Sequence, residues 1–424
     1  MHLLWLYLQP LYMITIIPFK ALRPEAQFAK LVASKPYDVL SSKEAKIEAQ
    51  GNPYSFLHIT KSEIDLADNT DPYSQKVYDK AKQNLDAFIS RNILFVENKP
   101  CYYIYEMVMA DGKNIHSQTG LVCCSSIDDY ENNIIKKHEF TTPVKEQDRI
   151  NHIKATGAQT GNVFLTYNNV DEIDSIIENW KKSKGAVYNF ISDDNIQHAI
   201  WIINDEGIIK NISALFKEKV SCTYIADGHH RAASAAKVRV YFGANSNAAN
   251  YFLTTIFPSS QLKIMEYNRV VKDLNGLTED EFLQKINENF SVVKTNEPFL
   301  PNEPHTFGMY LNKNWYRLSA NENTFTDDPI GVLDITILQN NLLQPLLGIV
   351  DQRTDKRIDF VGGIRGLSEL ENKVNNGDAA VAFSFYPVTV QQLFNIADSE
   401  NVMPPKSTWF EPKLRDGLLT HMVV

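Results

Sequence analysis

The sequence predicts an α+β protein whose sheets are mixed or antiparallel. Strand-like and helix-like segments alternate along its 424 residues, and two pairs of strand-like segments flank short turns, which is typical of antiparallel hairpins. We find no repeat of 20–50 residues, so a solenoid is not expected. Hydrophobic residues make up 44% of the chain and charged residues 22%, as in an ordinary globular protein.

The first twelve residues, MHLLWLYLQPLY, are an apolar extension that we separate from residues 13–424. This extension lacks a basic start and a small-residue cleavage site, and it is too short to span a bilayer. Met13 directly precedes ITIIPFKALRP, which has the pattern of a first strand. Two interpretations stay open for residues 1–12: a start codon assigned too far upstream, or a real docking extension. We expect residues 13–424 to form a single unit.

Local patterns predict the main elements in chain order. Helical spacing of apolar residues predicts a helix over residues 74–92. Strand-like runs on both sides of a short turn predict hairpins, and short apolar runs predict buried strands. The hairpins are expected over 101–127 and 306–320, the buried strands over 163–167 and 199–203, and a helix broken near Pro345 over 332–349.

The stretch TYIADGHHRAASAAK (223–237) predicts a strand, a tight turn and a helix. Its first residues are β-branched and apolar, DG is a turn, and the alanine-rich remainder is helical. The first backbone N–H groups of a helix have no internal acceptor, and the helix dipole adds partial positive charge there. Two imidazoles and a guanidinium in that first turn therefore predict an anion site, for which phosphate is the best fit.

Each residue of this turn has an expected role. Gly228 lets the backbone approach a ligand, and Asp227 can cap the helix or hold an imidazole or a metal. Arg231 offers a two-pronged donor, while His229 and His230 offer donors or proton carriers near neutral pH. The alternative is a capped helix start with surface histidines. We expect no metal site from these histidines alone, because neighbours on a helix point apart and H-x-x-x-H spacing is missing.

The stretch KKHEFTTPVKEQDR (136–149) supplies a second set of candidates. Here TTP ends one segment before a further helix begins, so the N-terminus of that helix is another candidate anion site. His138 and Glu139 lie where they could transfer protons. A purely structural charge cluster is the alternative. The further candidate ligand-binding residues of this stretch are Lys145 and Arg149.

Candidates also lie in later segments of the chain. The segment MPPKSTWFEPKLRDGL (403–418) is rich in rigid residues, and it is expected either to clamp the C-terminus onto the body or to bind phosphate. Its candidate phosphate ligands are Lys406, Ser407 and Thr408. The other candidate substrate-binding residues are Asn268, Arg269 and Arg353. We expect Arg231, Glu139, Arg353 and Lys406 to lie within one ligand's reach of the Gly228 turn.

Charge and cysteine content limit the classes of function. The net charge of −9 disfavours a protein that follows nucleic acid by bulk electrostatics, since such proteins carry basic stripes. The four cysteines form no C-x-x-C pair, which fits a reduced, cytoplasmic compartment. No apolar run is long enough to suggest a membrane span. The oligomeric state is left open.

The DGHHR turn resembles the signature of the ParB/sulfiredoxin-like superfamily, whose members include chromosome-partitioning proteins, sulfiredoxins and free-serine kinases. The resemblance implies a ParB/sulfiredoxin-like core in which this turn holds nucleotide phosphates. In the serine-kinase relatives an early glutamate serves as base, which makes Glu25 a candidate.

A second resemblance spans the chain from Met13 and is to domain-of-unknown-function family 1015. This family often accompanies serine-biosynthesis enzymes, which implies a role in serine metabolism. One departure is Ala232, where the family pattern leads us to expect an aromatic residue. The matching stretches are PFKALRP (18–24), PYDVLSSKEA (36–45), NPYSFLHI (52–59), KKHEFTTPVKEQDR (136–149), IADGHHRAASAA (225–236), YNRVVKDLNG (267–276), DQRTDKRIDFVGG (351–363) and MPPKSTWFEPKLRDGL (403–418).

Together these observations predict an enzyme that handles a phosphate ester, with an anion-binding core around residues 136–276. The narrower hypothesis is phosphoryl transfer or hydrolysis that involves serine and phosphoserine, with Mg²⁺ expected if a nucleotide takes part. Arg231 and the first backbone N–H groups of the helix would bind the phosphoryl group. His229 or His230 would act as general acid and base or as phosphoryl acceptor, and Glu25 or Glu139 would serve the hydroxyl or a water. The alternative is a non-catalytic nucleotide-binding or DNA-associated module.

Overall fold

The computed structural model describes residues 13–112 and 114–424, and these residues form two compact units. Unit 1 comprises the chain up to Leu262 together with Pro412–Val424, and unit 2 comprises Lys263–Glu411. This division differs from the single unit expected over 13–424, and the boundary cuts both the expected core (136–276) and the expected clamp (403–418). The apolar extension of residues 1–12 lies outside the described residues.

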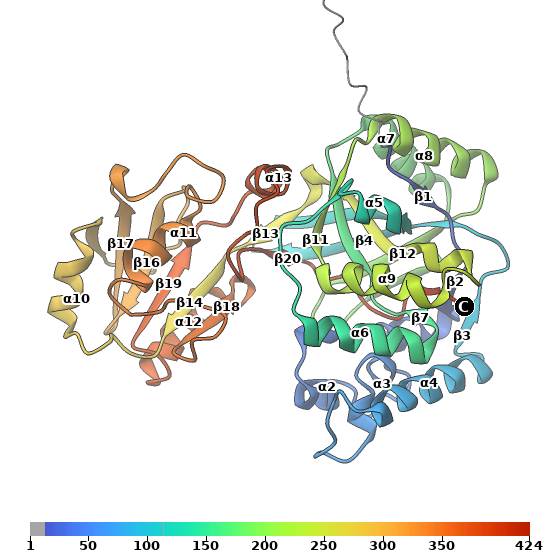
Figure 1. Ribbon diagram of the computed structural model, residues 1–424, viewed down its shortest axis with the longest axis horizontal. Helices are drawn as coiled ribbons and strands as arrows, with labels where there is room; N and C mark the ends of the chain where they lie inside the picture. The colour runs from blue at the N-terminus through green and yellow to red at the C-terminus, as the bar shows by residue number, and fades with distance from the viewer. Residues whose placement is uncertain (1–12, 113) are drawn as a thin grey trace, which may run out of the picture. The chain divides into compact units, whose positions relative to one another are not determined.

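Unit 1 is built on a nine-stranded mixed sheet (Figure 1). The strand order is β6-β11-β8-β12-β5-β4-β10-β9, and β1 pairs with β5 beside this path. β11 runs parallel to β6 and β12 parallel to β8, while the other pairings are antiparallel. The bounds are β1 Ile16–Ile17, β4 Tyr102–Asp111, β5 Asn114–Ser126, β6 Ile135–Lys136, β8 Val163–Tyr167, β9 Tyr188–Ile191, β10 Gln197–Ile203, β11 Thr223–Asp227 and β12 Tyr251–Pro258.

A smaller antiparallel sheet in unit 1 has the order β3-β2-β21-β7. It joins segments from both ends of the described chain, because β2 (Ala21–Pro24) pairs with β21 (Thr420–Met422). The outer strands are β3 (Leu94–Val96) and β7 (Ala158–Gln159).

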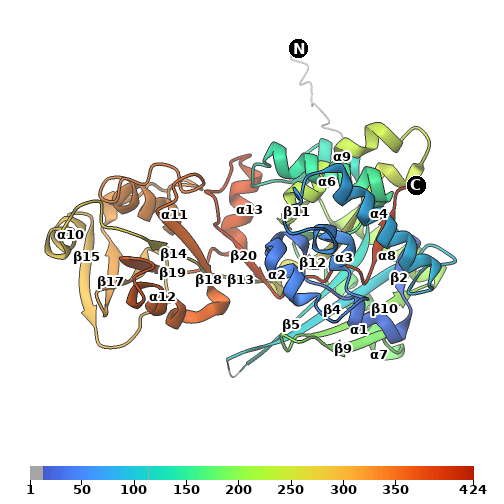
Figure 2. The same cartoon turned by 90° about the horizontal axis from the view of Figure 1, so that it is seen from below.

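Helices cover the large sheet of unit 1 and bury its apolar side chains. α6 and α9 pack against each other, and α4 packs against α6; all three lie side by side in both views (Figure 1; Figure 2). α7 and α8 pack together over another part of the core. The bounds are α1 Ala29–Val32, α2 Ser42–Glu48, α3 Leu57–Thr60, α4 Gln75–Ser90, α5 Ile127–Glu131, α6 Pro143–Thr156, α7 Asp171–Ser183, α8 Glu206–Lys219 and α9 His229–Phe242.

Unit 2 contains a six-stranded antiparallel sheet with the order β15-β17-β16-β19-β14-β18. A separate pair joins β13 to β20. The strand bounds are β13 Lys263–Met265, β14 Tyr267–Val271, β15 Phe290–Thr295, β16 Thr306–Leu311, β17 Asn314–Ala320, β18 Ile358–Gly362, β19 Val381–Phe385 and β20 Trp409–Glu411. The helices are α10 Glu279–Ile286, α11 Asp334–Leu338, α12 Gly366–Asn375 and α13 Val390–Asp398.

The structure confirms the α+β class with mixed sheets and most of the expected elements. The helix over 74–92 is α4, and the hairpins are β4–β5 and β16–β17. The buried strand over 163–167 is β8, and that over 199–203 lies within β10. The helix expected over 332–349 is shorter: α11 changes to a π-helical turn at Gln339–Leu343, before Pro345 removes a backbone donor.

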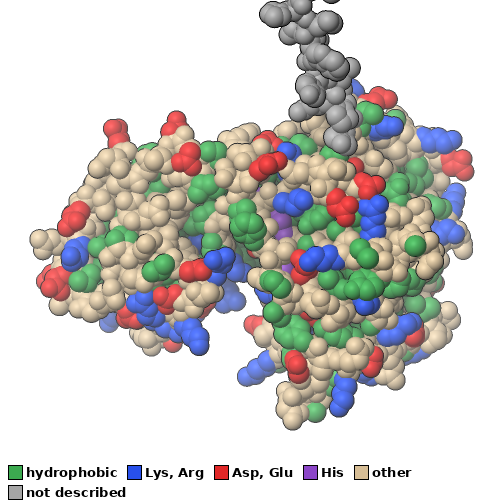
Figure 3. Space-filling model, in the orientation of Figure 1, with side chains coloured by type: hydrophobic (Ala, Val, Ile, Leu, Met, Phe, Trp, Pro, Cys, Tyr) green, Lys and Arg blue, Asp and Glu red, His purple; other side chains and the backbone are tan. Residues whose placement is uncertain are grey.

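On the face drawn in Figure 3, Lys and Arg side chains are interspersed with Asp and Glu. A mixture of this kind does not form the basic stripe of a phosphate-tracking protein. Within the described part of the chain, no helix combines the length and apolar content needed to cross a bilayer.

Candidate functional site

The predicted strand, turn and helix are present in unit 1 as β11, Gly228 and α9. Gly228 has a φ of +99°, a conformation that side chains rarely adopt, and a Cβ there would lie 3.4 Å from the Val163 Cα. Gly228 is the N-cap of α9, and no side chain caps the helix. The first N–H groups of α9 are therefore without a side-chain acceptor at the end of β11.

His229 is buried and packs edge-on against His138, with ring centroids 4.6 Å apart. Its Nε2 accepts a hydrogen bond from the His138 backbone N–H at 3.4 Å, which assigns the proton of neutral His229 to Nδ1. This Nδ1 lies 3.6 Å from the Glu139 Oε2. Burial, with a smaller contribution from His138, lowers the pKa of His229 well below its ordinary value. His229 is thus a neutral donor directed at a half-exposed carboxylate.

His230 joins α9 to the N-terminus of α6. Its Nε2 accepts from the Thr142 backbone N–H at 3.0 Å, and the Thr142 hydroxyl lies 3.3 Å away. Burial, with a smaller effect of Lys145, lowers the pKa of His230. α6 begins with Pro143 at its first position, as expected, and Thr142 does not cap it by a side-chain hydrogen bond. Two helix N-termini therefore meet at this histidine.

Arg231 is held rigidly beneath the turn. Its Nη1 donates to the Asn162 carbonyl, and its Nη2 donates to the Asp38 Oδ2 at 2.8 Å. A Cβ on Gly161 would lie 3.2 Å from the Arg231 Cδ, so the glycine makes room for this side chain. Arg231 is consequently a fixed cation whose present counter-ion is Asp38.

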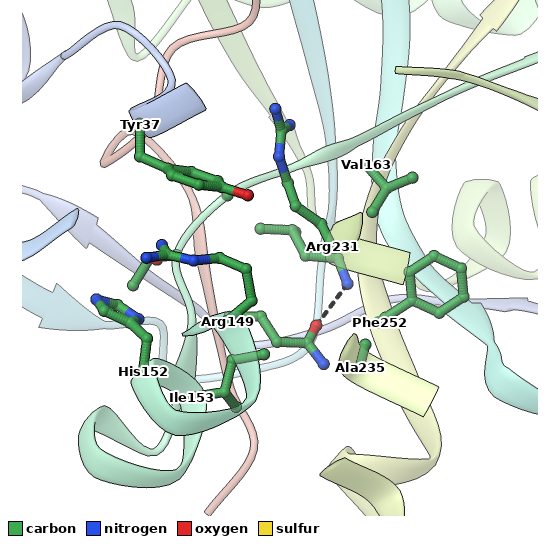
Figure 4. Close-up of a pocket in the computed structure, with 12 residues that line it drawn as sticks. Tyr37, Arg149, His152, Ile153, Val163, Arg231, Ala235 and Phe252 are labelled. Atoms are coloured by element: carbon green, nitrogen blue, oxygen red, sulfur yellow. Dashed lines mark hydrogen bonds between the residues drawn. The ribbon is translucent and has the colours of Figure 1, made fainter. Parts of the chain in front are cut away.

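Tyr37 lies between two arginines (Figure 4). The Cζ of Arg149 is 3.8 Å from the ring centroid, and that of Arg231 is 5.8 Å from it. Burial raises the pKa of Tyr37 far above its ordinary value, so the hydroxyl stays protonated. Arg149 donates through Nε and Nη2 to the Asp148 Oδ2 at 2.9 and 2.6 Å. The ring thus holds two cations close together, which an anionic ligand could use.

Residues 412–416 return to unit 1 and complete the site. The Lys413 Nζ lies 3.1 Å from the Asp227 Oδ2. Burial alone would raise the pKa of Asp227, but the charges of Lys413 and Arg231 hold it well below its usual range. Asp416 is buried nearby, and burial raises its pKa to about 7 although Arg231 opposes the change. The site therefore combines one firmly ionised and one easily protonated aspartate.

Two cavities adjoin these arginines, and both are lined by Tyr37 and Arg149. The smaller measures about 20 Å³, enough for a single water molecule, and also touches Arg231. The larger measures about 280 Å³ and is also lined by Asp38 and Lys145. This volume is close to the lower limit of pockets that bind small molecules. Lys145 is exposed and forms no ion pair with a residue that the structure describes.

Three deeply buried side chains at this site have a polar atom without a protein partner. They are His138 at Nδ1, Arg231 at Nε and Asp416 at Oδ2, and the residues are 2%, 8% and 2% exposed. A buried polar atom without a partner costs about 1–3 kcal/mol, so such atoms rarely gather without a function. Their gathering at a helix N-terminus indicates a site for a polar ligand.

Six candidate residues lie in unit 2, away in sequence from α9. Arg269 is wholly buried between the Phe360 and Phe385 rings, donates to the carbonyls of Pro405 and Lys406, and has a pKa that burial lowers to about 9. The other five have the following surroundings: Asn268 accepts from the Phe385 N–H, Arg353 pairs with Asp351, Lys406 lies over the Tyr267 ring, Ser407 donates to the Pro404 carbonyl, and Thr408 is half-buried. Their proximity to the Gly228 turn stays a prediction.

Glu25 is exposed at the end of β2, where its charge acts on Tyr188 of β9. The catalytic role of Glu25 stays a prediction. Conversely, Asp38, Lys413 and Asp416 contact the site and were not among the candidates. Buried arginines need counter-ions, so looking for a carboxylate to pair with every buried cation could have indicated the aspartates.

The described residues contain no group of three or more His, Cys, Asp and Glu side chains placed to hold a metal ion. A resident zinc centre therefore does not fit this site. Mg²⁺ bound together with a nucleotide needs only one or two carboxylates in addition to the phosphates, so it does not require a group of three side chains. Mg²⁺ with a nucleotide therefore stays a prediction.

Comparisons with known proteins identify the family. The model of the family described as "Protein of unknown function (DUF1015)" matches residues 16–336, and the chain belongs to this family. Among curated proteins, none matches this chain.

Three solved structures are similar to the chain at low identity. A free serine kinase in complex with AMP is 10% identical, with a TM-score of 0.35 over 70% of this chain and 91% of that chain. A conserved hypothetical protein from Pyrococcus furiosus is 12% identical, with a TM-score of 0.34 over 71% and 94%. SbnI with a C-terminal truncation, from Staphylococcus aureus, is 10% identical, with a TM-score of 0.35 over 70% and 85%. We therefore argue function from the site itself.

Proposed function

We propose that this DUF1015 protein binds a phosphate ester at the first turn of α9 and transfers or hydrolyses its phosphoryl group. The observation that carries the proposal is the meeting of two uncapped helix N-termini, α6 and α9, at buried polar atoms without protein partners. Helix N-termini bind anions because their N–H groups and dipoles favour negative charge. In this proposal, the bound phosphate accepts hydrogen bonds from donors that have no acceptor within the protein.

Cations around the turn support phosphate over a neutral ligand. Arg231 and Arg149 are fixed by hydrogen bonds and by the Tyr37 ring, and Lys145 stands at the first turn of α6. Fixed guanidinium groups stabilise charge that develops on a phosphoryl group in the transition state without reorganising. Arg231 and the α9 N–H groups therefore take the phosphoryl oxygens in this proposal.

The two histidines serve as donors in this proposal. Each already uses its Nε2 lone pair to accept from a backbone N–H, of His138 for His229 and of Thr142 for His230. A neutral imidazole with one nitrogen so engaged has only the opposite N–H to offer. Transient phosphorylation of either ring would first require the loss of one of these backbone hydrogen bonds.

Glu139 is then the proposed general base. It is half-exposed, and its Oε2 lies 3.6 Å from the His229 Nδ1. In the transfer reaction, a substrate hydroxyl gives its proton to Glu139, its oxygen bonds to phosphorus, and the phosphorus–oxygen bond to the donor breaks. In hydrolysis, a water takes the place of the substrate hydroxyl and gives its proton to Glu139, the phosphorus–oxygen bond of the ester breaks, and the leaving oxygen takes up that proton. The roles of Lys406, Ser407 and Thr408 in binding the phosphate remain part of the proposal.

The substrate we propose is serine or phosphoserine, with a nucleotide as phosphoryl donor or acceptor. Support for it is the family resemblance together with a cavity of about 280 Å³ beside Arg149 that is lined by several hydroxyl groups. Ser41, Ser42 and Tyr73 are among the hydroxyl-bearing residues of its wall. A small, polar, phosphorylated metabolite matches this lining better than an apolar ligand.

A ligand screen followed by a turnover assay tests the proposal. Melting temperature is measured with phosphoserine, serine, ADP, ATP, CTP and orthophosphate; a ligand at a hundred times its dissociation constant should stabilise the protein by about 2.7 kcal/mol. Single-turnover phosphate release or transfer is then measured for the stabilising ligands. Stabilisation without turnover would leave a binding module, and no stabilisation by any phosphate would refute the proposal.

A further inference from the structure

Asp38 accepts from only one of the two donor nitrogens on the edge of the Arg231 guanidinium that faces it. Nε and Nη2 of a guanidinium lie on one edge and can together bind two oxygens of an anion. In Arg231, Nη2 donates to the Asp38 Oδ2 at 2.8 Å, while Nε has no protein acceptor. Among the described residues, four other arginines place both nitrogens of this edge on one carboxylate: Arg23 with Glu97, Arg149 with Asp148, Arg353 with Asp351, and Arg357 with Asp355.

A hydrogen bond at Nη1 and close packing against two glycines restrict Arg231 from turning to improve this contact. Nη1 donates to the Asn162 carbonyl, and a Cβ on Gly161 or Gly228 would lie within 3.6 Å of the Arg231 side chain. Asp38, in contrast, stands on a three-residue turn, Tyr37–Val39, and its side chain is 32% exposed. The carboxylate is therefore the movable partner of this ion pair.

A neighbouring cavity leaves room for the Asp38 side chain to move. Asp38 lines this cavity of about 280 Å³, on the wall that Tyr37 and Lys145 share. The oxygens of a phosphate can accept from both Nε and Nη2, whereas Asp38 accepts only from Nη2. Asp416, buried beside Arg231, has an Oδ2 without a protein partner, and in its protonated form it could donate to a third phosphate oxygen.

We propose that Asp38 is an exchangeable counter-ion, which occupies the place of the ligand's phosphate on Arg231 and is displaced when the phosphate binds. This inference rests on the proposed function. It adds that Asp38 weakens phosphate binding, since the ligand must replace an ion pair that already exists. It also gives the site a preference for anions that fill both nitrogens of the edge over anions that fill one.

The direction of a single substitution tests this inference. Asp38→Asn removes the competing charge but keeps the size of the side chain. Partly exposed ion pairs are worth up to about 1 kcal/mol, so inorganic phosphate should bind about fivefold more tightly to the variant. Without phosphate the variant should melt at a lower temperature than the parent, because Arg231 loses its counter-ion. Added phosphate should then raise its melting temperature more than that of the parent.

The experiment is isothermal titration of inorganic phosphate into the full-length parent, Asp38→Asn and Asp68→Asn at one salt concentration. Asp68 pairs with Lys46 on the surface, so Asp68→Asn controls for the loss of one negative charge. Tighter binding by Asp38→Asn alone supports the inference, including the case in which the parent does not bind measurably. If the parent binds phosphate and Asp38→Asn binds it equally or more weakly, this inference is wrong, whereas the proposed function still stands. Absence of binding by all three proteins overturns both.

Discussion

Acid should unfold unit 1 before unit 2, because unit 1 buries several neutral histidines. The unfolded chain protonates a histidine near pH 6.5, whereas burial keeps these side chains neutral to a lower pH in the folded state. Between the two pKa values the unfolded state binds more protons, so the free energy of unfolding falls as the pH falls. Burial lowers the pKa of His138, His152 and His421 to about 4, that of His198 to about 3, and that of His229 by a large amount.

The size of the effect follows from these pKa values. From pH 7 to pH 5, each histidine with a pKa of about 4 or below lowers the free energy of unfolding by about 2 kcal/mol, or about 8 kcal/mol for His138, His152, His198 and His421 together, and His229 acts in the same direction. Two buried aspartates oppose the loss, since burial raises the pKa of Asp416 to about 7 and that of Asp129 to about 6. They become protonated in the folded state and return about 4 kcal/mol. The net loss, before the contribution of His229, is about 4 kcal/mol, which is a large part of the whole stability of many domains.

Denaturant titrations at pH 7, 6 and 5, followed by hydrogen exchange with mass spectrometry, separate the two units. Protection factors, which correct for the slower intrinsic exchange at low pH, should fall strongly at pH 5 in β8, β11 and α9, while those in β16 and β19 of unit 2 should change little. His152→Gln should reduce the slope of unit 1 stability between pH 7 and pH 5 by about 1 kcal/mol per pH unit, because the amide keeps a donor for the Ile59 carbonyl and does not titrate. Equal stability of unit 1 at pH 7 and pH 5, or earlier loss of unit 2, would refute the reasoning.

Three substitutions give further tests. Arg231→Lys keeps the charge but loses the planar pair of donors, so the rate of single-turnover phosphate transfer should fall about a hundred- to a thousandfold while the protein still folds. An unchanged rate would exclude Arg231 from the chemistry. Glu139→Gln should lower turnover at least about a hundredfold with little change in phosphate affinity, and Glu206→Gln on the exposed start of α8 should lower neither. Gly417→Ala should lower the free energy of unfolding of unit 1 by about 3 kcal/mol, because its φ is +88° and a Cβ would lie 2.6 Å from the Phe56 Cγ. Gly51→Ala, with a φ of +77° and open space, should cost about 1 kcal/mol, and equal losses would contradict the role of the Phe56 contact.

Local pattern predicted the strand, turn and helix over 223–242 because each part follows from neighbouring residues. β-branched residues form β11, Gly228 takes a positive φ, and alanines let α9 pack against the core. The same holds for the start of α6, where Pro143 occupies the first helical position as expected. Sequence therefore predicted the two helix N-termini that meet in the site.

The partners of Arg231 and the division into units were not predictable in this way. Asp38 and Asp416 are far from Arg231 in sequence, and only the folded chain brings them together. The C-terminal segment was singled out for its Lys-Ser-Thr run, but the residues that interact with Asp227 and Arg231 are Lys413 and Asp416, which follow this run. The unit boundary at Leu262 has no linker composition, because an ordered strand begins there.

The order of synthesis gives the return of residues 412–424 to unit 1 a consequence for biogenesis. At about 5–20 residues per second, the ribosome needs roughly 10–30 s to make residues 263–411. During this time the small sheet lacks β21 between β2 and β7, and Asp227 lacks its partner Lys413. A released chain that ends just before residue 412 would contain all of unit 2 but an open unit 1. The candidate site is thus completed only after unit 2 has been made, and until then unit 1 has unpaired strand edges at β2 and β7.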